Sequence, residues 1–288
     1  MKKILVIGSK GMAGHVILYY LKSKKNFEVF SMARSIEKSD FNFSLDVSDT
    51  NKVKTIILEN QFDVIVNCIG ILNKNAEENP ETAIWYNSYF PHFIESITRN
   101  TTTKIIHIST DCVFSGEKGS YTENDFKDGI GFYAQSKALG EIINDKDVTI
   151  RTSIIGPELK LNGIGLLNWF LNQPENTNLK GFTNAFWTGL TTLELAKVIV
   201  AIIEQNIKGL IQVTPQNKIS KYNLLKLFNT IYRNDKLIIL KEDKYKIDKS
   251  LSSIRTDFNY IVPTYKKMLI EQKKWMLKNN NIYKHYSL

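Results

Sequence analysis

Short runs rich in β-branched residues alternate with segments of helical periodicity along the first half of the chain. The runs are KILVIG, FEVFSMA, FDVIVNCIG, KIIHIST and DVTIRTSII, and the helical segments are MAGHVILYYLKS, DTNKVKTIILEN, NPETAIWYNSYFPHFIESITRN and YAQSKALGEIIND. The runs are apolar throughout rather than on alternate residues, which is typical of strands buried on both faces of a parallel sheet. This order predicts a doubly wound α/β fold over residues 1–157.

The regular alternation of strands and helices ends after Pro157. A Gly- and Asn-rich stretch, LNGIGLLNWFLNQ, precedes two helical segments, TLELAKVIVAIIEQN and KYNLLKLFNTIYRN, and the short strand GLIQVT between them is expected to return to the sheet. We expect residues 158–288 to form a smaller, mostly helical substrate-binding part over the carboxyl edge of the sheet. The polar segment KEDKYKIDKSLSSIRTD is expected to be a mobile surface loop.

Composition narrows the classes of protein. The chain has 288 residues, of which 43% are hydrophobic, so a large core needs no disulfide framework, and its two cysteines lack metal or disulfide spacing. Glycines interrupt the apolar N-terminal run after five residues, and no run approaches the roughly 20 residues of a membrane span. We therefore expect a cytoplasmic protein that does not act at a membrane.

The net charge of +9 comes from lysines that are scattered and mixed with acids. This pattern does not favour nucleic acid as a partner, because nucleic-acid binding needs a basic patch. A positive field does favour capture of small polyanions such as nucleotide cofactors.

Three glycines spaced three apart, Gly8, Gly11 and Gly14, follow the first predicted strand and lead into the first predicted helix. Glycines in this place allow a sharp turn and a close approach to a pyrophosphate, which then lies at the positive N-terminus of the helix. The segment GSKGMAG therefore predicts dinucleotide binding. The expected cofactor contacts in it are Gly8, Ser9, Lys10, Gly11, Met12 and Gly14.

The end of the second predicted strand indicates which dinucleotide is bound. Arg34 stands where an NAD-specific site would carry an acidic residue for the ribose 2′-hydroxyl. Together with Ser9 and Lys10 it could pair with a 2′-phosphate, so NADPH is the expected cofactor and NADH the alternative. A solvated arginine after a strand is the competing interpretation of Arg34.

Two further segments are expected at the cofactor. Asp46 could accept a hydrogen bond from the adenine amino group while Val47 packs beside the ring, although Asp46 could equally serve the N-terminus of the following helix. The fourth predicted strand ends in small or slim residues that suit a backbone close to the pyrophosphate and ribose. These residues are Cys68, Ile69 and Gly70.

The fifth predicted strand ends at Ser109 and Thr110, so a hydroxyl is expected at the carboxyl edge where ligands bind in such folds. Tyr133 lies 23 residues later and is followed four residues on by Lys137, which places both on one helix face. Five tyrosines in this chain have a lysine at that spacing, so the spacing alone carries little weight. Only this pair follows a hydroxyl-ending strand within the dinucleotide-binding half.

The segments GSKGMAG, NCIG, STDCVFSG and YAQSK resemble those of the extended short-chain dehydrogenase/reductase superfamily. STDCVFSG is similar, more narrowly, to the signature of dTDP-4-dehydrorhamnose reductases, which reduce sugar-nucleotide 4-keto groups. The similarity covers residues 1–157, and only TTLELAK and ISKYNLLKLF continue it in the second half. It implies NADPH-dependent reduction of a nucleotide-linked 4-keto-6-deoxy sugar in deoxysugar and cell-surface polysaccharide biosynthesis.

The resemblance also implies catalytic roles. Thr110 would hydrogen-bond the keto oxygen, Tyr133 would deliver the proton, and Lys137 would hold the nicotinamide ribose and favour tyrosinate. Asn87, in the preceding long helix, matches an Asn that organises the active-site water and backbone in the superfamily. We expect these four residues to be catalytic and expect Tyr133 and Lys137 to contact the cofactor as well.

The chain departs from the family at two places. Cys112 stands where family reductases usually carry Tyr, so the sugar or its nucleotide could differ from the family's namesake. Val16 replaces a Glu through which some members bind magnesium in dimers, and the four histidines lack ligand spacing, so no metal is expected. The resemblance leaves a homodimer open.

Substrate contacts are expected from two regions. The signature loop supplies Thr110, Cys112, Val113 and Phe114. The glycine-bounded segment GFTNAFWTG, expected to be a loop, could bind a sugar or base, although its aromatic residues are equally good packing residues. Its candidates are Asn184, Phe186 and Trp187, and Lys249 and Arg255 are candidates for a diphosphate unless they are merely solvated.

Two alternatives stay open. A sugar-nucleotide dehydratase would need Asp-Glu after the Thr, whereas this chain has Asp111-Cys112, and epimerases and dehydratases are commonly longer in the substrate half. A non-catalytic NADP-binding partner protein, like the regulatory subunit of methionine adenosyltransferase, would not need to retain Thr110, Tyr133 and Lys137.

Overall fold

A computed structural model describes residues 1–287. Its centre is a seven-stranded sheet in the order β10-β6-β5-β4-β1-β2-β3, and every neighbouring pair is parallel. The strands are β1 (Lys2–Ile7), β2 (Phe27–Ala33), β3 (Asn42–Ser44), β4 (Val64–Asn67), β5 (Lys104–Ser109), β6 (Val148–Arg151) and β10 (Gly209–Gln212). The predicted doubly wound α/β fold is confirmed, and GLIQVT returns to the sheet as β10.

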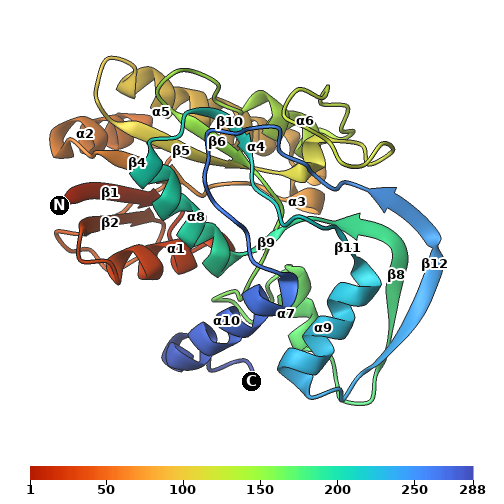
Figure 1. Ribbon diagram of the computed structural model, residues 1–288. Helices are drawn as coiled ribbons and strands as arrows, with labels where there is room; N and C mark the ends of the chain where they lie inside the picture. The colour runs from red at the N-terminus through yellow and green to blue at the C-terminus, as the bar shows by residue number, and fades with distance from the viewer. Residues whose placement is uncertain (288) are drawn as a thin grey trace.

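Helices cover both faces of this sheet (Figure 1). Successive residues of β1 point to opposite faces: Ile4 and Val6 pack with helices α1 (Met12–Lys22) and α8 (Thr192–Gln205), whereas Leu5 and Ile7 pack with α2 (Thr50–Asn60) and α5 (Phe90–Thr98). The period of two explains why the strand sequences are apolar throughout.

Short helices complete the first half around the edge where β4 and β5 end. They are α3 (Asn73–Glu78), α4 (Pro80–Ala83), the π-helix η1 (Ile84–Tyr89), the 3₁₀-helix η2 (Asp111–Val113) and α6 (Phe132–Leu139). The helix expected to continue from Tyr133 to residue 145 ends instead at Leu139. Gly140 is its C-cap, and only glycine fits there because a Cβ would lie 1.8 Å from the Asn87 carbonyl oxygen.

The second half contains a three-stranded sheet that the sequence does not predict. β8 (Asn178–Trp187) pairs antiparallel with β11 (Ile219–Ser220) and parallel with the long strand β12 (Ile238–Asp248). The expected loop GFTNAFWTG is therefore mostly strand, and the expected surface loop KEDKYKID is an edge strand. The edge position explains its charges, which face solvent while its backbone pairs with β8.

Three helices pack with this small sheet into a second core (Figure 1). They are α7 (Leu166–Leu171), α9 (Lys221–Arg233) and α10 (Tyr265–Lys278); the two-stranded ladder β7 (Ile154–Ile155) with β9 (Leu190–Thr191) and the 3₁₀-helix η3 (Asn280–Ile282) are the remaining elements. A domain boundary at residue 157 stays a prediction, since α8 and β10 pack on the large sheet. No helix within residues 1–287 is both long enough and apolar enough to span a bilayer.

Candidate active site

The glycine loop joins β1 to α1 with little space for side chains. Gly8 has φ +80, and a Cβ on it would lie 3.1 Å from the carbonyl carbon of Cys68. A Cβ on Gly14 would lie 2.2 Å from the Gly8 carbonyl oxygen, so the first turn of α1 rests directly on the loop. The Gly11 N–H donates to the Gly8 carbonyl at 2.9 Å. No side chain caps the N-terminus of α1 by a hydrogen bond, and this helix end is where the sequence predicts a bound pyrophosphate.

The other predicted residues of this loop face different ways. The buried Ser9 hydroxyl donates to the Met32 carbonyl at 3.4 Å, which ties the loop to β2. Lys10 extends toward the end of β2, where its ammonium donates to the Ser35 carbonyl at 3.0 Å. The Met12 sulfur lies under Gly165, 3.2 Å from the position of a Cβ there. Lys10 is thus the loop residue on the same side as Arg34.

Arg34 and Asp46 form one group at the expected adenosine end. The Arg34 guanidinium, whose side chain is 77% exposed, lies 3.6 Å from the Asp46 carboxylate. The Ser48 N–H donates to that carboxylate at 3.0 Å and lowers the pKa of Asp46. Asp49, not Asp46, caps α2, so the competing role for Asp46 is filled by its neighbour. Val47 is buried in the core beneath.

The end of β4 lies against the glycine loop, and a Cβ on Gly8 would also lie 3.0 Å from the Ile69 side chain. Burial raises the pKa of the Cys68 thiol to about 12. Gly70 lies against Asn87, because a Cβ on it would be 3.7 Å from the side-chain oxygen of Asn87. The segment 68–70 is therefore adjacent to the predicted cofactor path, as its slim residues indicate.

Asn87 links this segment to the catalytic helix. Its side-chain oxygen accepts from the Ile71 N–H at 2.8 Å, and its amide nitrogen donates to the Ile71 carbonyl and the Ser136 hydroxyl, both at 3.0 Å. It is fully buried in the π-helix η1, a distortion often found at functional sites. Asn87 therefore fixes backbone and helix here rather than facing the substrate.

Thr110 and Tyr133 come together at the carboxyl edge of β5. The Thr110 hydroxyl accepts from the Cys112 N–H at 3.1 Å and donates to the Asp111 carboxylate at 3.2 Å. Burial raises the pKa of Tyr133 well above its usual value, as does the neighbouring Cys112, and the Thr110 hydroxyl offsets part of the rise. Tyr133 is therefore protonated at neutral pH, which is the form that its predicted role as proton donor requires.

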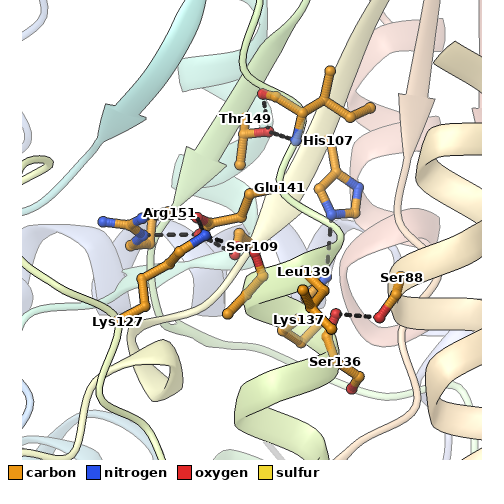
Figure 2. A network of polar contacts seen from close by, with 12 residues as sticks. Ser88, His107, Ser109, Lys127, Ser136, Lys137, Leu139, Glu141, Thr149 and Arg151 are labelled. Carbon is orange, nitrogen blue, oxygen red and sulfur yellow. Dashed lines mark hydrogen bonds and ion pairs between the residues drawn. The ribbon is translucent and has the colours of Figure 1, made fainter.

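Lys137 lies one turn further along α6 and points back under β5 (Figure 2). Its ammonium donates to the Ile108 carbonyl at 2.7 Å and lies 3.4 Å from His107 Nε2. Burial lowers the pKa of Lys137 to about 8. His107 is itself held by Asn67, whose amide lies 3.2 Å from Nδ1. Because burial lowers the pKa of His107 well below its usual value, this imidazole is neutral beside the ammonium.

A buried ionic network lies beside the C-terminal end of α6 (Figure 2). Arg151 donates to both carboxylate oxygens of Glu141, at 2.9 and 2.8 Å, and Ser109 and Lys127 donate to the same carboxylate at 2.8 and 3.2 Å. Burial alone would raise the pKa of Glu141, but these partners outweigh it and hold the pKa below its usual range. The guanidinium also lies 4.9 Å from the centre of the Phe114 ring. The network thus joins β5, β6, the signature loop and the segment that follows α6.

A second acid missed by sequence reasoning holds the start of α6. The Glu77 carboxylate accepts from the N–H groups of Phe132 and Tyr133 at 3.0 and 3.1 Å, which caps the helix that carries the predicted acid. Gly131, at φ +93, allows this approach. No motif signals it, since Glu77 lies 56 residues before Tyr133 in the sequence.

The signature loop exposes less to a substrate than predicted. Val113 and Phe114 have no solvent exposure, and Phe114 stacks on Tyr121 with ring centres 4.2 Å apart. Their side chains build the loop's own core, so only their backbone could meet a substrate. Cys112 is half-buried beside Tyr133, and burial raises the pKa of its thiol to about 12.

The remaining substrate candidates separate in space. Trp187 is a core residue whose indole donates to Ser153 at 2.8 Å, whereas Asn184 and Phe186 line a hollow. Lys249 lies at the signature loop, where its stem would meet a Cβ on Gly116. Arg255 binds Asp257 and the carbonyls of Lys208 and Leu210 at the amino end of β10. That is the edge opposite Thr110, so the geometry removes Arg255 from the predicted site.

Within residues 1–287 no group of three or more His, Cys, Asp or Glu side chains is arranged to hold a metal ion.

A glycine turn at the first strand, with a hydroxyl, tyrosine and lysine gathered at the carboxyl edge of the sheet, defines an extended short-chain dehydrogenase/reductase, as the sequence predicts. The chain belongs, within that class, to the family described as RmlD substrate binding domain, whose model matches residues 1–241.

Named relatives agree with this assignment. The chain is 26% identical over 229 residues to the "probable low-salt glycan biosynthesis reductase Agl14" of Haloferax volcanii, covering 75% of each chain. It is 23% identical to the dTDP-4-keto-6-deoxy-D-glucose reductase of Streptomyces niveus, covering 77% of this chain and 76% of the relative. A dTDP-4-dehydrorhamnose reductase structure from Bacillus anthracis, in complex with NADP, has the same fold, with a TM-score of 0.80 at 18% identity over 96% of this chain and 99% of that one. The predicted resemblance to these reductases is confirmed.

Proposed function

We propose that this chain reduces the 4-keto group of a nucleotide-linked 6-deoxy sugar, in the biosynthesis of deoxysugars and cell-surface polysaccharide. The observation that carries the proposal is the meeting of Thr110 and Tyr133 at the edge of β5, with Lys137 directed beneath them, in a chain of the RmlD family. The named relatives above are sugar and glycan reductases, which supports an NADP-dependent oxidoreductase.

The residues present fit NADPH. The cradle at Gly8 and Gly14 would be filled by any Cβ, and Lys10 and Arg34 both lie at the end of β2, where a 2′-phosphate would be met. NADPH, when bound, supplies the hydride. NADH is the weaker alternative, because a site for NADH needs an acid that is free to bind the ribose 2′-hydroxyl. The acid that pairs with Arg34 is Asp46, and its carboxylate already accepts from the Ser48 N–H.

Each catalytic residue then has one task. The Thr110 hydroxyl orients the keto oxygen, and Tyr133 donates its proton to that oxygen as negative charge develops there. Burial favours this direction, because it keeps Tyr133 protonated until the oxygen becomes basic. Lys137, with a pKa of about 8, holds the ribose of the cofactor and supplies a positive charge near the new tyrosinate.

The test is NADPH consumption with a panel of dTDP- and UDP-linked 4-keto-6-deoxy sugars, with Tyr133→Phe measured alongside. NADPH oxidation by the wild type that is lost in Tyr133→Phe would support the reductase, and the sugar that gives it would identify the substrate and its nucleotide. Tight NADPH binding without reduction of any sugar on the panel would contradict it.

A second function has a specific observation in its favour. Methionine adenosyltransferase 2 subunit beta of Danio rerio is 27% identical over 143 residues, covering 49% of this chain and 42% of the relative. A non-catalytic NADP-binding partner would bind the cofactor, and replacing Tyr133 would not change its function.

A cytoplasmic location and a homodimer stay predictions.

A further inference from the structure

His107 lies in the middle of β5, and none of the predicted catalytic roles uses it. It is paired in register with Asn67 of β4, so the two side chains lie next to each other on one face of the sheet, and neither has any solvent exposure. The Asn67 amide nitrogen lies 3.2 Å from Nδ1 of the ring, and Nε2 lies 3.4 Å from Lys137 Nζ (Figure 2). His107 therefore connects the end of β4 to the lysine of the predicted trio.

The backbone fixes how the Asn67 amide is turned. The Ile69 N–H donates to the Asn67 side-chain oxygen at 3.1 Å, and because an N–H cannot accept, the oxygen must face it. The amide nitrogen is thereby turned toward His107, where it donates to Nδ1. Burial lowers the pKa of His107 well below its usual value, so the ring is neutral. A neutral imidazole has one N–H and one acceptor nitrogen, so the proton of His107 lies on Nε2.

The Nε2–H of His107 is directed at Lys137. An ammonium has three donor hydrogens and no acceptor, so the charged form of Lys137 cannot accept this N–H. The neutral amine has a lone pair that can accept it, and the amine can still donate to the Ile108 carbonyl at 2.7 Å. The position under β5 therefore suits the amine, whereas the ammonium meets a positively polarised hydrogen there.

Three other titratable groups act on this pair of side chains. Glu141 and Cys68 both favour the ammonium of Lys137. The Glu141 carboxylate is held in the buried ionic network, and among residues 1–287 no carboxylate lies within 4.0 Å of Nζ. The Cys68 thiol, with a pKa of about 12, is uncharged at neutral pH, and His92 lowers the pKa of His107 further. None of these groups offers the ammonium an acceptor in place of Nε2.

We propose that His107 is a positioning residue for Lys137: its Nε2–H, fixed in place by Asn67, turns the ammonium away from β5 and toward the cofactor ribose and Tyr133. The inference rests on the proposed function, in which Lys137 holds that ribose, and it adds the two residues that direct the charge. His107 acts only through Lys137, because its two ring nitrogens face Asn67 and Lys137.

The tautomer can be measured by NMR on the full chain labelled with ¹⁵N at histidine. A protonated and an unprotonated ring nitrogen have well-separated ¹⁵N shifts, and those of His107 are assigned by elimination, from variants of the other histidines. At neutral pH we expect a neutral ring with its proton on Nε2. Asn67→Asp should move the proton to Nδ1, because a carboxylate only accepts. A proton on Nδ1 in the wild type, or an imidazolium, would overturn the inference.

The effect on Lys137 can be measured from the ¹³Cε shifts of labelled lysines during a pH titration. Burial lowers the pKa of both Lys137 and Lys104 to about 8, which separates them from ordinary lysines. Lys104, at the start of β5, binds Asn206 at 3.0 Å and is the internal control. His107→Phe should raise the titration of Lys137 by about one pH unit and leave Lys104 unchanged, because the N–H that faced the ammonium is gone.

Saturation with NADP⁺ tests the direction in which Lys137 is turned. With the ammonium at the ribose, His107→Phe should shift the titration of Lys137 much less than in the free chain. An unchanged titration in the free variant, or equal shifts with and without NADP⁺, would overturn the inference. If His107→Phe does not fold, Asn67→Asp replaces it, since the lone pair then facing Nζ should also raise the titration of Lys137.

Failure of the inference can be distinguished from failure of the proposed function, because no turnover is measured. A chain that bound NADP⁺ and gave the expected shifts, yet reduced no keto sugar, would support the role of His107 and sink the reductase alone. A chain that bound no NADP⁺ would overturn both.

Discussion

The replacement Glu141→Gln removes one negative charge from the buried network without changing the shape of the side chain. Arg151 would then keep a guanidinium that is 1% exposed, with no ionised partner for the two hydrogen bonds it now donates to Glu141. One nitrogen of this guanidinium, Nη1, already has no hydrogen-bond partner. We therefore expect Glu141→Gln to destabilise the fold strongly.

The magnitude follows from the burial of the pair. Removing one partner of a buried ion pair costs about 3–5 kcal/mol, because the remaining charge is left uncompensated. At about 2 °C per kcal/mol for a chain of this size, Tm should fall by about 6–10 °C. Activity should fall as well, since Ser109 donates to the same carboxylate and precedes Thr110.

The assay is thermal and urea unfolding, with Glu175→Gln as the matched control. Glu175 forms an exposed pair with Lys236, at 2.8 Å, so its loss should leave Tm almost unchanged. Adding Arg151→Met to Glu141→Gln should recover part of the loss, because the stranded charge is removed. A Tm for Glu141→Gln equal to that of the control would refute the argument.

Three further predictions can be checked directly. Tyr133→Phe should lower kcat about 10²- to 10⁴-fold while NADPH affinity, measured by fluorescence, is retained; an active variant would contradict the assigned acid. His15 donates from Nδ1 to the Gly11 carbonyl at 2.8 Å and accepts from Tyr283, and burial lowers its pKa to about 4. As pH falls, this histidine is protonated in the unfolded chain at pH 6.5 but in the folded chain only near pH 4, so about 3 kcal/mol of the free energy of unfolding should be lost between these values. His15→Gln should flatten this pH dependence in urea titrations. Arg34→Ala should weaken NADPH about 3- to 10-fold relative to NADH in competition binding, and an unchanged ratio would assign Arg34 to solvent.

Local sequence signals were sufficient for the first half of the molecule. A Gly triplet between a strand and a helix, and a Thr at the end of another strand, report backbone geometry that is set within a few residues. Because parallel strands must end at one edge, those signals also predict that Gly8, Thr110 and Tyr133 share that edge. The end of α6 was predicted wrongly: the helix stops at Leu139, and Gly140 then packs on the carbonyl of Asn87, which is distant in the sequence.

The second half was decided by tertiary structure. KEDKYKID is polar enough for a loop, and it is a strand only because β8 offers a partner for its backbone. The sequence around a polar residue in this half does not indicate where in the fold its side chain lies. Arg255 and Lys249 are both basic residues in polar segments, yet Arg255 lies at the amino edge of the sheet and the stem of Lys249 lies against Gly116 of the signature loop.

The sequence by itself determined the fold class and the glycine loop, because each depends on short strand-turn-helix units, and its resemblance to a known family predicted the trio of Thr110, Tyr133 and Lys137. The supports of that trio came only from the folded chain: Glu77 at the start of α6, and Glu141 with Arg151 just past its C-terminal end. The physical reason is distance along the chain. A capping acid or a buried ion pair is defined by the group opposite it in space, and that group is set by the packing of elements that are distant in the sequence.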